Sequence, residues 1–313
     1  MREIFPHIGL AKLCGWFGLS RQAYYQHRSA AVRTTICEEL ILDQVKQIRE
    51  KHRRMGTRKL YQKLSPFLRA HQIKMGRDGL FSLLSAHHLL IRKRKRRVQT
   101  TQSFHWLRKY PNLIKDFSPR APNQLWVSDI TYWKIAIGYV YISFITDAFS
   151  HKIVGYHLAR TLETVETIQA LNMALADFEE QALAQLIHHS DRGVQYCSGA
   201  YVERLKQYQV QISMTEQGDP LENPVAERLN GIIKEEYLYD LEVDSFEEAK
   251  KQLDQAVRLY NEERPHMSID NHTPSQVHHA SEHIQYKKKW KKYYQHQNYA
   301  VNLNQDLDKN VKS

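Results

Sequence analysis

The chain has 313 residues, of which 42% are hydrophobic, so it can form two or three domains with buried cores. No apolar run approaches the roughly 18 residues that a membrane span needs, and the N-terminus lacks a signal-peptide layout, so we expect a cytoplasmic protein. The three cysteines include no C-x-x-C pair, which argues against a disulfide scaffold and against a zinc finger.

The net charge of +11 is distributed unevenly along the chain. Residues 1–121 contain 26 Lys and Arg against 7 Asp and Glu, residues 122–280 contain 12 against 24, and residues 281–313 contain 7 against 3. The basic flanks should attract a polyanion, for which nucleic acid is the usual candidate. The acidic middle would repel that polyanion unless cations intervene, so a metal-dependent nuclease core explains the arrangement better than a solvated acidic surface does.

Residues 8–28 have the pattern of two helices separated by a turn. Apolar residues recur at helical spacing up to Phe17, Gly18 interrupts the pattern, and Ser20 can cap a second, short helix. The segment could be a helical hairpin that only packs, but a DNA-binding helix-turn-helix is the favoured interpretation. In that case three side chains of the second helix are expected to face DNA: Arg21, Gln22 and Tyr25.

Residues 38–70 predict two further helices, with a break at Gly56 and a cap at Thr57, and another helix is expected to begin near Asp78. Six consecutive cations follow, which should be extended and exposed because like charges repel one another in a compact fold. We expect this segment to be both a linker and an arm that binds DNA phosphates. It consists of Arg92, Lys93, Arg94, Lys95, Arg96 and Arg97.

The composition predicts the domain boundaries. Residues 98–123 have little periodicity, so they are expected to link a helical DNA-binding region, residues 1–97, to a second domain, residues 124–280. A basic and aromatic tail, residues 281–313, follows. Its segment KKKWKKYY, residues 287–294, could equally grip DNA by phosphate contact and stacking or form a solvated helix end.

The second domain has an α/β pattern. Three β-rich runs with short gaps predict an antiparallel meander with turns at Gly138 and Ser150. After these three strands come a helix, a strand, a helix, a strand and a helix, which is an α/β order of elements. The later elements are a helix over residues 164–178, a strand that ends at Asp191, a helix over residues 198–208, a short strand, and a helix opened by Asn223 and Pro224.

Three acidic residues stand at unusual places in these elements. Asp129 lies within the first strand, where Asp is unfavourable, Asp191 ends an apolar strand, and Glu227 lies in the first turn of the last helix. Each acid alone has a structural explanation, such as capping or interaction with the helix dipole. If the first and fourth strands are neighbours, however, the two aspartates can face each other, with the glutamate closing the group.

Clustered carboxylates raise one another's pKa, and hard cations such as Mg²⁺ relieve the repulsion. Two metals about 4 Å apart can activate the attacking oxygen and stabilise the leaving oxygen of a phosphodiester transfer. The three acids are therefore candidates for both the catalytic and the metal-binding residues.

The motifs around these acids are W-V-S-D-I-T-Y, H-S-D-R-G-V-Q-Y and N-P-V-A-E-R-L-N-G-I-I-K. Together they resemble the Asp-Asp-Glu transposases and retroviral integrases, in which an interval of 35 residues between the last two acids, as found between Asp191 and Glu227, is typical. The closing segment N-E-E-R-P-H-M-S-I-D-N-H-T-P-S-Q is similar as well. The closest resemblance is to bacterial insertion-sequence transposases of the second-reading-frame type, and it covers nearly the whole chain.

The resemblance implies a ribonuclease-H-like fold with a mixed five-stranded sheet in the order 3-2-1-4-5, flanked by helices. It implies a transposase that cleaves transposon ends with water and joins the 3′-hydroxyl to target DNA, with Mg²⁺ as cofactor and Mn²⁺ as a substitute. The implied partners are double-stranded DNA, as terminal inverted repeats and target, and further copies of the chain at the nucleoid. Whether a first-reading-frame product or fusion is required stays open.

The resemblance also assigns Lys234, seven positions after Glu227, to DNA contact, and we expect it to be exposed. Arg192 and Arg228, beside the acids, are expected to bind DNA as well. Other polar residues near the acids have different expected roles. His188 and His189 lack zinc spacing, but one could orient Asp191 or touch the scissile phosphate; Asp147 is expected to be a turn acid, and Trp126 and Tyr196 to be core residues.

Two other functions fit parts of this pattern. A simple ribonuclease-H-type nuclease would share the acids but would not join strands. A non-catalytic DNA-binding protein derived from a transposase would need only the helices and basic arms, and the presence of all three acids argues against it.

Overall fold

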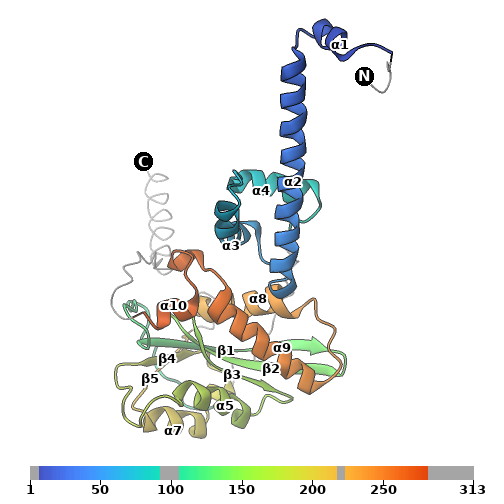
Figure 1. The fold of residues 1–313 in the computed structure, drawn as a ribbon. Helices are drawn as coiled ribbons and strands as arrows, with labels where there is room; N and C mark the ends of the chain where they lie inside the picture. The colour runs from blue at the N-terminus through green and yellow to red at the C-terminus, as the bar shows by residue number, and fades with distance from the viewer. Residues whose placement is uncertain (1–6, 92–105, 217–222, 281–313) are drawn as a thin grey trace, which may run out of the picture. The chain divides into compact units, whose positions relative to one another are not determined.

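The structure is a computed structural model that describes residues 7–91, 106–216 and 223–280 (Figure 1). The chain divides into two compact units, Met1–Arg92 and Lys93–Ser313. The predicted basic arm, residues 92–97, and the predicted C-terminal tail lie outside the described residues. Within the described ranges, no helix is both long enough and apolar enough to cross a membrane.

The described part of the first unit is helical, with α1 (Leu10–Trp16), α2 (Arg21–Lys51), α3 (Thr57–Ala70) and α4 (Arg77–Ala86). The helices α3 and α4 pack against the second half of α2 only, and the first half of α2 extends beyond them (Figure 1). Leucines that recur at three- and four-residue spacing give α3 and α4 their apolar faces. The centre of this core consists of Ile41, Val45, Leu60, Leu64, Leu80 and Leu84.

The prediction of a short second helix followed by a separate helix from residue 38 is wrong, because α2 is one continuous helix of 31 residues. No Gly or Pro occurs between Ser20 and Gly56, so nothing in the backbone chemistry ends the helix earlier. The predicted cap at Ser20 is confirmed, since its side chain accepts a hydrogen bond from the Ala23 N–H. Thr57 is the first residue of α3 rather than its cap, which is Gly56.

The second unit contains a mixed five-stranded sheet in the order β3-β2-β1-β4-β5, which confirms the predicted fold class. The strands β1, β2 and β3 form the predicted antiparallel meander, whereas β4 is parallel to β1 and β5 is parallel to β4. The bounds are β1 (Leu125–Ile135), β2 (Gly138–Asp147), β3 (Ile153–Ala159), β4 (Ile187–Ser190) and β5 (Gln211–Met214).

Helices cover both faces of this sheet (Figure 1). The helices α5 (Thr164–Leu175) and α7 (Gly199–Gln207) enclose one core, and α8 (Pro224–Ile233) and α9 (Phe246–Arg258) enclose the other. Trp126 and Tyr196 belong to the first core, as predicted. Short elements complete the unit: α6 (Val194–Cys197), α10 (Pro274–His278), the π-helical turns η2 (Lys234–Leu238) and η3 (Leu259–Glu263), and the 3₁₀ turn η4 (Met267–Ile269).

Gly155 allows β3 and α5 to approach each other closely. A Cβ atom at this position would collide with the carbonyl oxygen of Ala170 and press on Ala174, both on α5. The absence of a side chain therefore fixes the distance between the sheet and one helical layer.

Candidate active site

The pairing of β1 with β4 brings the two aspartates to adjacent strands. Val127 lies beside His189 in the parallel register, so Asp129, two residues on, lies beside the position that Asp191 occupies directly after β4. The condition on which the predicted cluster depended, that the first and fourth strands are neighbours, is therefore met.

The charges that shift the pKa of Asp129 indicate that the three acids lie close together. Burial, followed by the charge of Asp191 and then that of Glu227, raises the pKa of Asp129 to about 8. Two hydrogen bonds oppose this shift: the Ile130 N–H donates to Oδ1 of Asp129 at 2.9 Å, and Nδ2 of Asn230 donates to Oδ2 at 2.7 Å. Each oxygen of the Asp129 carboxylate thus accepts a hydrogen bond, and the charges of both other acids raise its pKa.

The loop after β4 orients Asp191. The Gly193 N–H donates to Oδ1 of Asp191 at 2.9 Å, and the Ser190 hydroxyl donates to the Asp191 carbonyl oxygen at 3.0 Å. A Cβ atom at Gly193 would lie 3.0 Å from Oδ1 of Asp191. A side chain at this position would therefore crowd the carboxylate, so the glycine keeps the space beside it open.

The helix α8 carries Glu227 in its first turn, as predicted, with Asn223 at the N-cap position and Pro224 as its first residue. The side chain of Asn223 does not cap the helix, however. Its Nδ2 donates instead to the carbonyl oxygen of Ser128 at 2.9 Å, across to β1. The start of α8 is therefore tied to the residue that precedes Asp129.

Asn230 is a site residue that the sequence analysis missed. It lies one helical turn after Glu227, is buried, and contacts Asp129 directly. The signal that could have found it is an amide on the otherwise apolar inner face of α8, which holds Ala226, Leu229 and Ile233. Such a residue needs a polar partner when it is buried.

The oxygen donors suit a hard divalent cation, and the repulsion at Asp129 is of the kind that a cation relieves. Buried Oδ1 atoms of Asn223 and Asn230 also lack a hydrogen-bond partner among the described residues. Within those ranges, though, no three His, Cys, Asp or Glu side chains are already arranged as a metal site. Glu227 is exposed, and its charge contributes to the raised pKa of Asp129.

The prediction that Lys234 is exposed is wrong. Its side chain is buried, its Nζ donates to Oγ1 of Thr131 at 3.2 Å, and it lies 4.2 Å from the ring centroid of Tyr132. Burial lowers the pKa of Lys234, and the charge of Asp129 opposes this shift. The lysine therefore faces β1 near the acids because α8 packs directly on that strand.

The hypothesis that His188 or His189 orients Asp191 or touches the scissile phosphate stays a prediction. Both rings are buried, and burial lowers the pKa of His188 to about 3. Nε2 of His188 lies 2.8 Å from the Ser128 hydroxyl, and Nδ1 of His189 lies 2.8 Å from the Ser213 hydroxyl. These pairs join β4 to β1 and β5, so the histidines hold the sheet that positions the aspartates.

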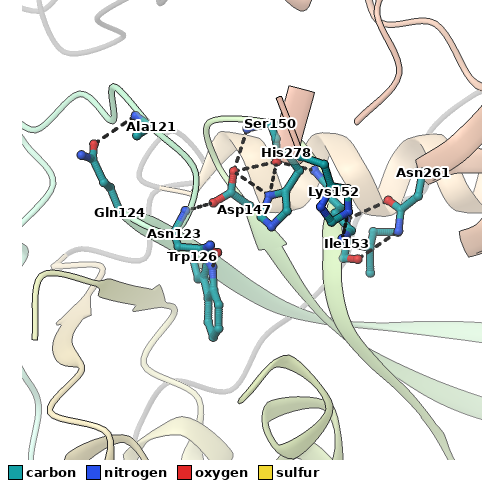
Figure 2. A network of polar contacts seen from close by, with 11 residues as sticks. Ala121, Asn123, Gln124, Trp126, Asp147, Ser150, Lys152, Ile153, Asn261 and His278 are labelled. Atoms are coloured by element: carbon teal, nitrogen blue, oxygen red, sulfur yellow. Dashed lines mark hydrogen bonds and ion pairs between the residues drawn. The ribbon is translucent and has the colours of Figure 1, made fainter. Parts of the chain in front are cut away.

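Asp147 is a structural acid, as predicted, and Figure 2 shows its contacts. Its carboxylate accepts hydrogen bonds from the Asn123 N–H and from both the N–H and the hydroxyl of Ser150, each at 2.7 Å. Burial opposes its ionisation, but the nearby His278, 3.8 Å away, and the hydrogen bonds from Ser150 prevail and lower the pKa of Asp147. The contacts with Ser150 close the β2–β3 turn, as expected for a turn acid.

The residues expected to bind DNA are distributed over both units. Arg228 is exposed beside Glu227, and Arg192 is half-buried beside Asp191. Arg21, Gln22 and Tyr25 are exposed in the first turns of α2, in the other unit. Whether any of them touches DNA stays a prediction.

Comparison with protein families finds two models, each described as an integrase core domain, at residues 119–220 and 208–274. The two matches together span the sheet and all three acids. Among solved structures, the chain is similar to the HTLV-2 integrase catalytic core domain in complex with magnesium. That similarity is 22% identity over 52% of this chain and 100% of that chain, with a TM-score of 0.42.

Curated relatives match over most of the chain. The insertion element IS600 31 kDa protein of Shigella sonnei is 34% identical over 84% of this chain and 96% of its own length. The transposase for insertion sequence element IS629, also of Shigella sonnei, is 29% identical over 76% of this chain and 80% of its own length. The chain therefore belongs to the insertion-sequence transposases with an integrase core domain.

Proposed function

We propose that this chain is a DNA transposase that cleaves phosphodiester bonds at the ends of its insertion sequence and joins the freed 3′-hydroxyl to target DNA. The observation that carries the proposal is the placement of Asp129 and Asp191 side by side on adjacent strands, with Glu227 in the first turn of α8, within an integrase core domain. Burial and then the charges of the two other acids raise the pKa of Asp129, which supports this placement. Acids whose pKa is strongly shifted by burial and by a specific charged neighbour are candidates for a functional site.

Asp129, Asp191 and Glu227 would hold Mg²⁺, or Mn²⁺ in its place, because hard cations prefer carboxylate oxygens. A bound pair of such cations supplies activation of the attacking oxygen and charge stabilisation of the leaving oxygen. The chain itself fixes the ligands. Asn230 and the Ile130 N–H hold the Asp129 carboxylate, and the Gly193 N–H holds that of Asp191.

Basic residues around the acids and in the first unit supply phosphate contacts in this proposal. Arg192 and Arg228 flank the acids, Arg21 and Gln22 begin α2, and residues 92–97 add six cations. Their neutralisation of DNA phosphates offsets the acidic balance of residues 122–280. The substrate is double-stranded DNA carrying the terminal inverted repeats, bound by more than one copy of the chain at the nucleoid.

Lys234 has a different role in this proposal. Its buried position and its interaction with Asp129 support a fixed positive charge that steadies the acidic cluster, rather than a contact with DNA. The hydrogen bond with Thr131 and the ring of Tyr132 hold that charge against β1.

The test uses the purified full chain and a duplex that ends in one terminal repeat, either uncut or already cut at the 3′ end. With Mg²⁺ or Mn²⁺, the uncut duplex should be cleaved at the repeat and the pre-cut end should be joined to a second duplex. Chelation should abolish both reactions but leave DNA binding intact. Cleavage without joining would identify a nuclease, binding without either reaction would identify a DNA-binding protein, and full activity after chelation would refute metal dependence.

A further inference from the structure

The first half of α2 exposes large apolar side chains that the fold of the unit does not cover. Tyr25, Val32, Ile36 and Leu40 are exposed by 51%, 52%, 50% and 43%. The unit's own core begins only at Ile41 and uses the second half of α2. Figure 1 shows the same division, because α3 and α4 lie along the later part of the helix. Exposed apolar surface of this extent on one helix marks an interaction site.

These residues form one continuous stripe. An α-helix advances about 100° per residue, so Tyr25, Val32, Ile36 and Leu40, together with the small residue Ser29, fall within an arc of about 80°. The spacings of three and four residues are those of a helix that packs against another helix. The preceding helix α1 leaves the stripe exposed, since Tyr25, Val32 and Ile36 each remain about half exposed.

The charged residues beside the stripe indicate which partner packs against it. Arg21 and Glu39 lie on the same edge of the stripe, about 40° from Tyr25, near its two ends. When two identical helices pack antiparallel about a two-fold axis, the same edges face each other. Arg21 of each copy then meets Glu39 of the other, Tyr25 lies opposite Ile36, and the small Ser29 accommodates Val32.

In a parallel pair Arg21 and Glu39 would lie about 27 Å apart along the axis and on opposite sides of the interface, so their charges would stay uncompensated. We propose that the stripe on α2 is a dimer interface, and that its partner is the antiparallel α2 of a second copy of this chain. The inference deepens the proposed function, because it names the surface through which copies of the transposase associate. It assigns Arg21 and Tyr25, which the sequence suggested as DNA contacts, to the protein interface.

The first experiment measures association of the full chain by sedimentation over a concentration series, without DNA and without divalent metal. The wild-type chain should dimerise, and Ile36→Glu should raise the dissociation constant about tenfold or more, because a charge enters the apolar centre. Thr34→Glu is the matched control, since Thr34 is exposed on the opposite side of the same helix. It should dimerise like the wild type.

The second experiment tests the antiparallel arrangement by charge reversal. Arg21→Glu and Glu39→Arg should each weaken dimerisation about threefold, and the double variant should recover to within about twofold of the wild type. In a parallel pair these residues would lie about 27 Å apart along the axis, and the double variant would show no recovery.

A monomeric wild type, or an Ile36→Glu variant that associates normally, would overturn the proposal. So would equal losses for Ile36→Glu and Thr34→Glu, or a loss of DNA binding by Ile36→Glu with no effect on association. Because DNA and metal are absent, these outcomes are independent of the proposed reaction. An Asp129→Asn variant, expected to be inactive, should dimerise like the wild type.

Discussion

Asp129 and Asp147 are acids on neighbouring strands, and their surroundings shift their pKa values in opposite directions. The pKa of Asp129 rises to about 8 because burial and two nearby acids disfavour its charge. The pKa of Asp147 falls because His278, whose Nδ1 lies 3.8 Å from Oδ1, and hydrogen bonds from Ser150 favour the charged carboxylate. Charge at Asp129 therefore costs stability in the metal-free protein, whereas charge at Asp147 contributes to it.

This contrast predicts a stabilising effect of Asp129→Asn without metal. The raised pKa means that the folded state retains a proton that the unfolded state releases above a pH of about 4. The stability contributed by protonation is therefore present at low pH and is lost as pH rises from about 4 to about 8. Thermal melts from pH 5 to pH 9 with chelator should show the wild type losing stability across this range and the variant losing less.

Asp147→Asn is the matched control and should have the opposite effect, a loss of about 1–3 kcal/mol at neutral pH, because buried donors lose a charged acceptor. Its lowered pKa confines the pH dependence of the wild-type contribution to values below about 4. If both variants destabilise the metal-free chain equally at pH 8, the repulsion inferred at Asp129 is absent.

Lys234 provides a second prediction at the residue scale. Lys234→Ala should destabilise the protein by about 1–3 kcal/mol, because it removes a buried cation that contacts Thr131 and Tyr132. DNA affinity and its salt dependence should change little, as for the control Lys134→Ala on the exposed side of β1. A lower DNA affinity with a salt slope reduced by about one unit, at an unchanged melting temperature, would instead make Lys234 a phosphate contact.

At the scale of elements, two asparagines join α8 to β1, and each has a different task. Asn223 binds the backbone of β1 at Ser128, whereas Asn230 binds the side chain of Asp129. Residues that orient metal ligands typically affect metal affinity about 10- to 100-fold. Asn230→Ala should therefore raise the Mg²⁺ concentration needed for half-maximal strand transfer by about tenfold or more, with DNA binding unchanged.

Asn223→Ala serves as the control, because it removes the same amide from the same helix. It should lower stability by about 1–2 kcal/mol and leave the Mg²⁺ dependence within about twofold of the wild type. Equal shifts of the Mg²⁺ dependence in both variants would mean that Asn230 acts only by holding the helix in place.

The sequence allowed prediction of the elements that have strong local signals. The strand around Asp129, the turn at Gly138, the cap at Ser20 and the sheet order followed from periodicity, turn chemistry and family resemblance. The length of α2 was missed because a helix-turn-helix pattern suggested an early end that no Gly or Pro enforces. Helix boundaries depend on tertiary packing as well as on local propensity.

The sequence suggested the three candidate acids but not the contacts that surround them. Motif spacing identified the three carboxylates, yet the roles of His188, Asn230 and Lys234 depend on which strand faces each side chain. The sequence gives the strand order only by resemblance, and it does not give the rotation of α8 against β1. Buried polar pairs across separate elements therefore required the structure.

At the scale of the whole molecule, the acidic residues 122–280 lie in the sequence between basic segments, and copies of the chain are proposed to pair through α2. The acidic balance of residues 122–280 makes DNA approach to the acids unfavourable without cations. Metal and basic flanks thus act together in this account, one at the scissile bond and the other along the DNA backbone.

The most direct test of the account is strand transfer of a pre-cut terminal repeat with Mg²⁺ by Asp129→Asn, Asp191→Asn and Glu227→Gln. Each variant should bind the DNA normally and lose at least about a thousandfold in joining rate, because each removes a proposed metal ligand. Glu203→Gln, an exposed acid on α7, is the control and should join DNA like the wild type. Near-wild-type joining by any of the three variants would contradict the assignment of that residue.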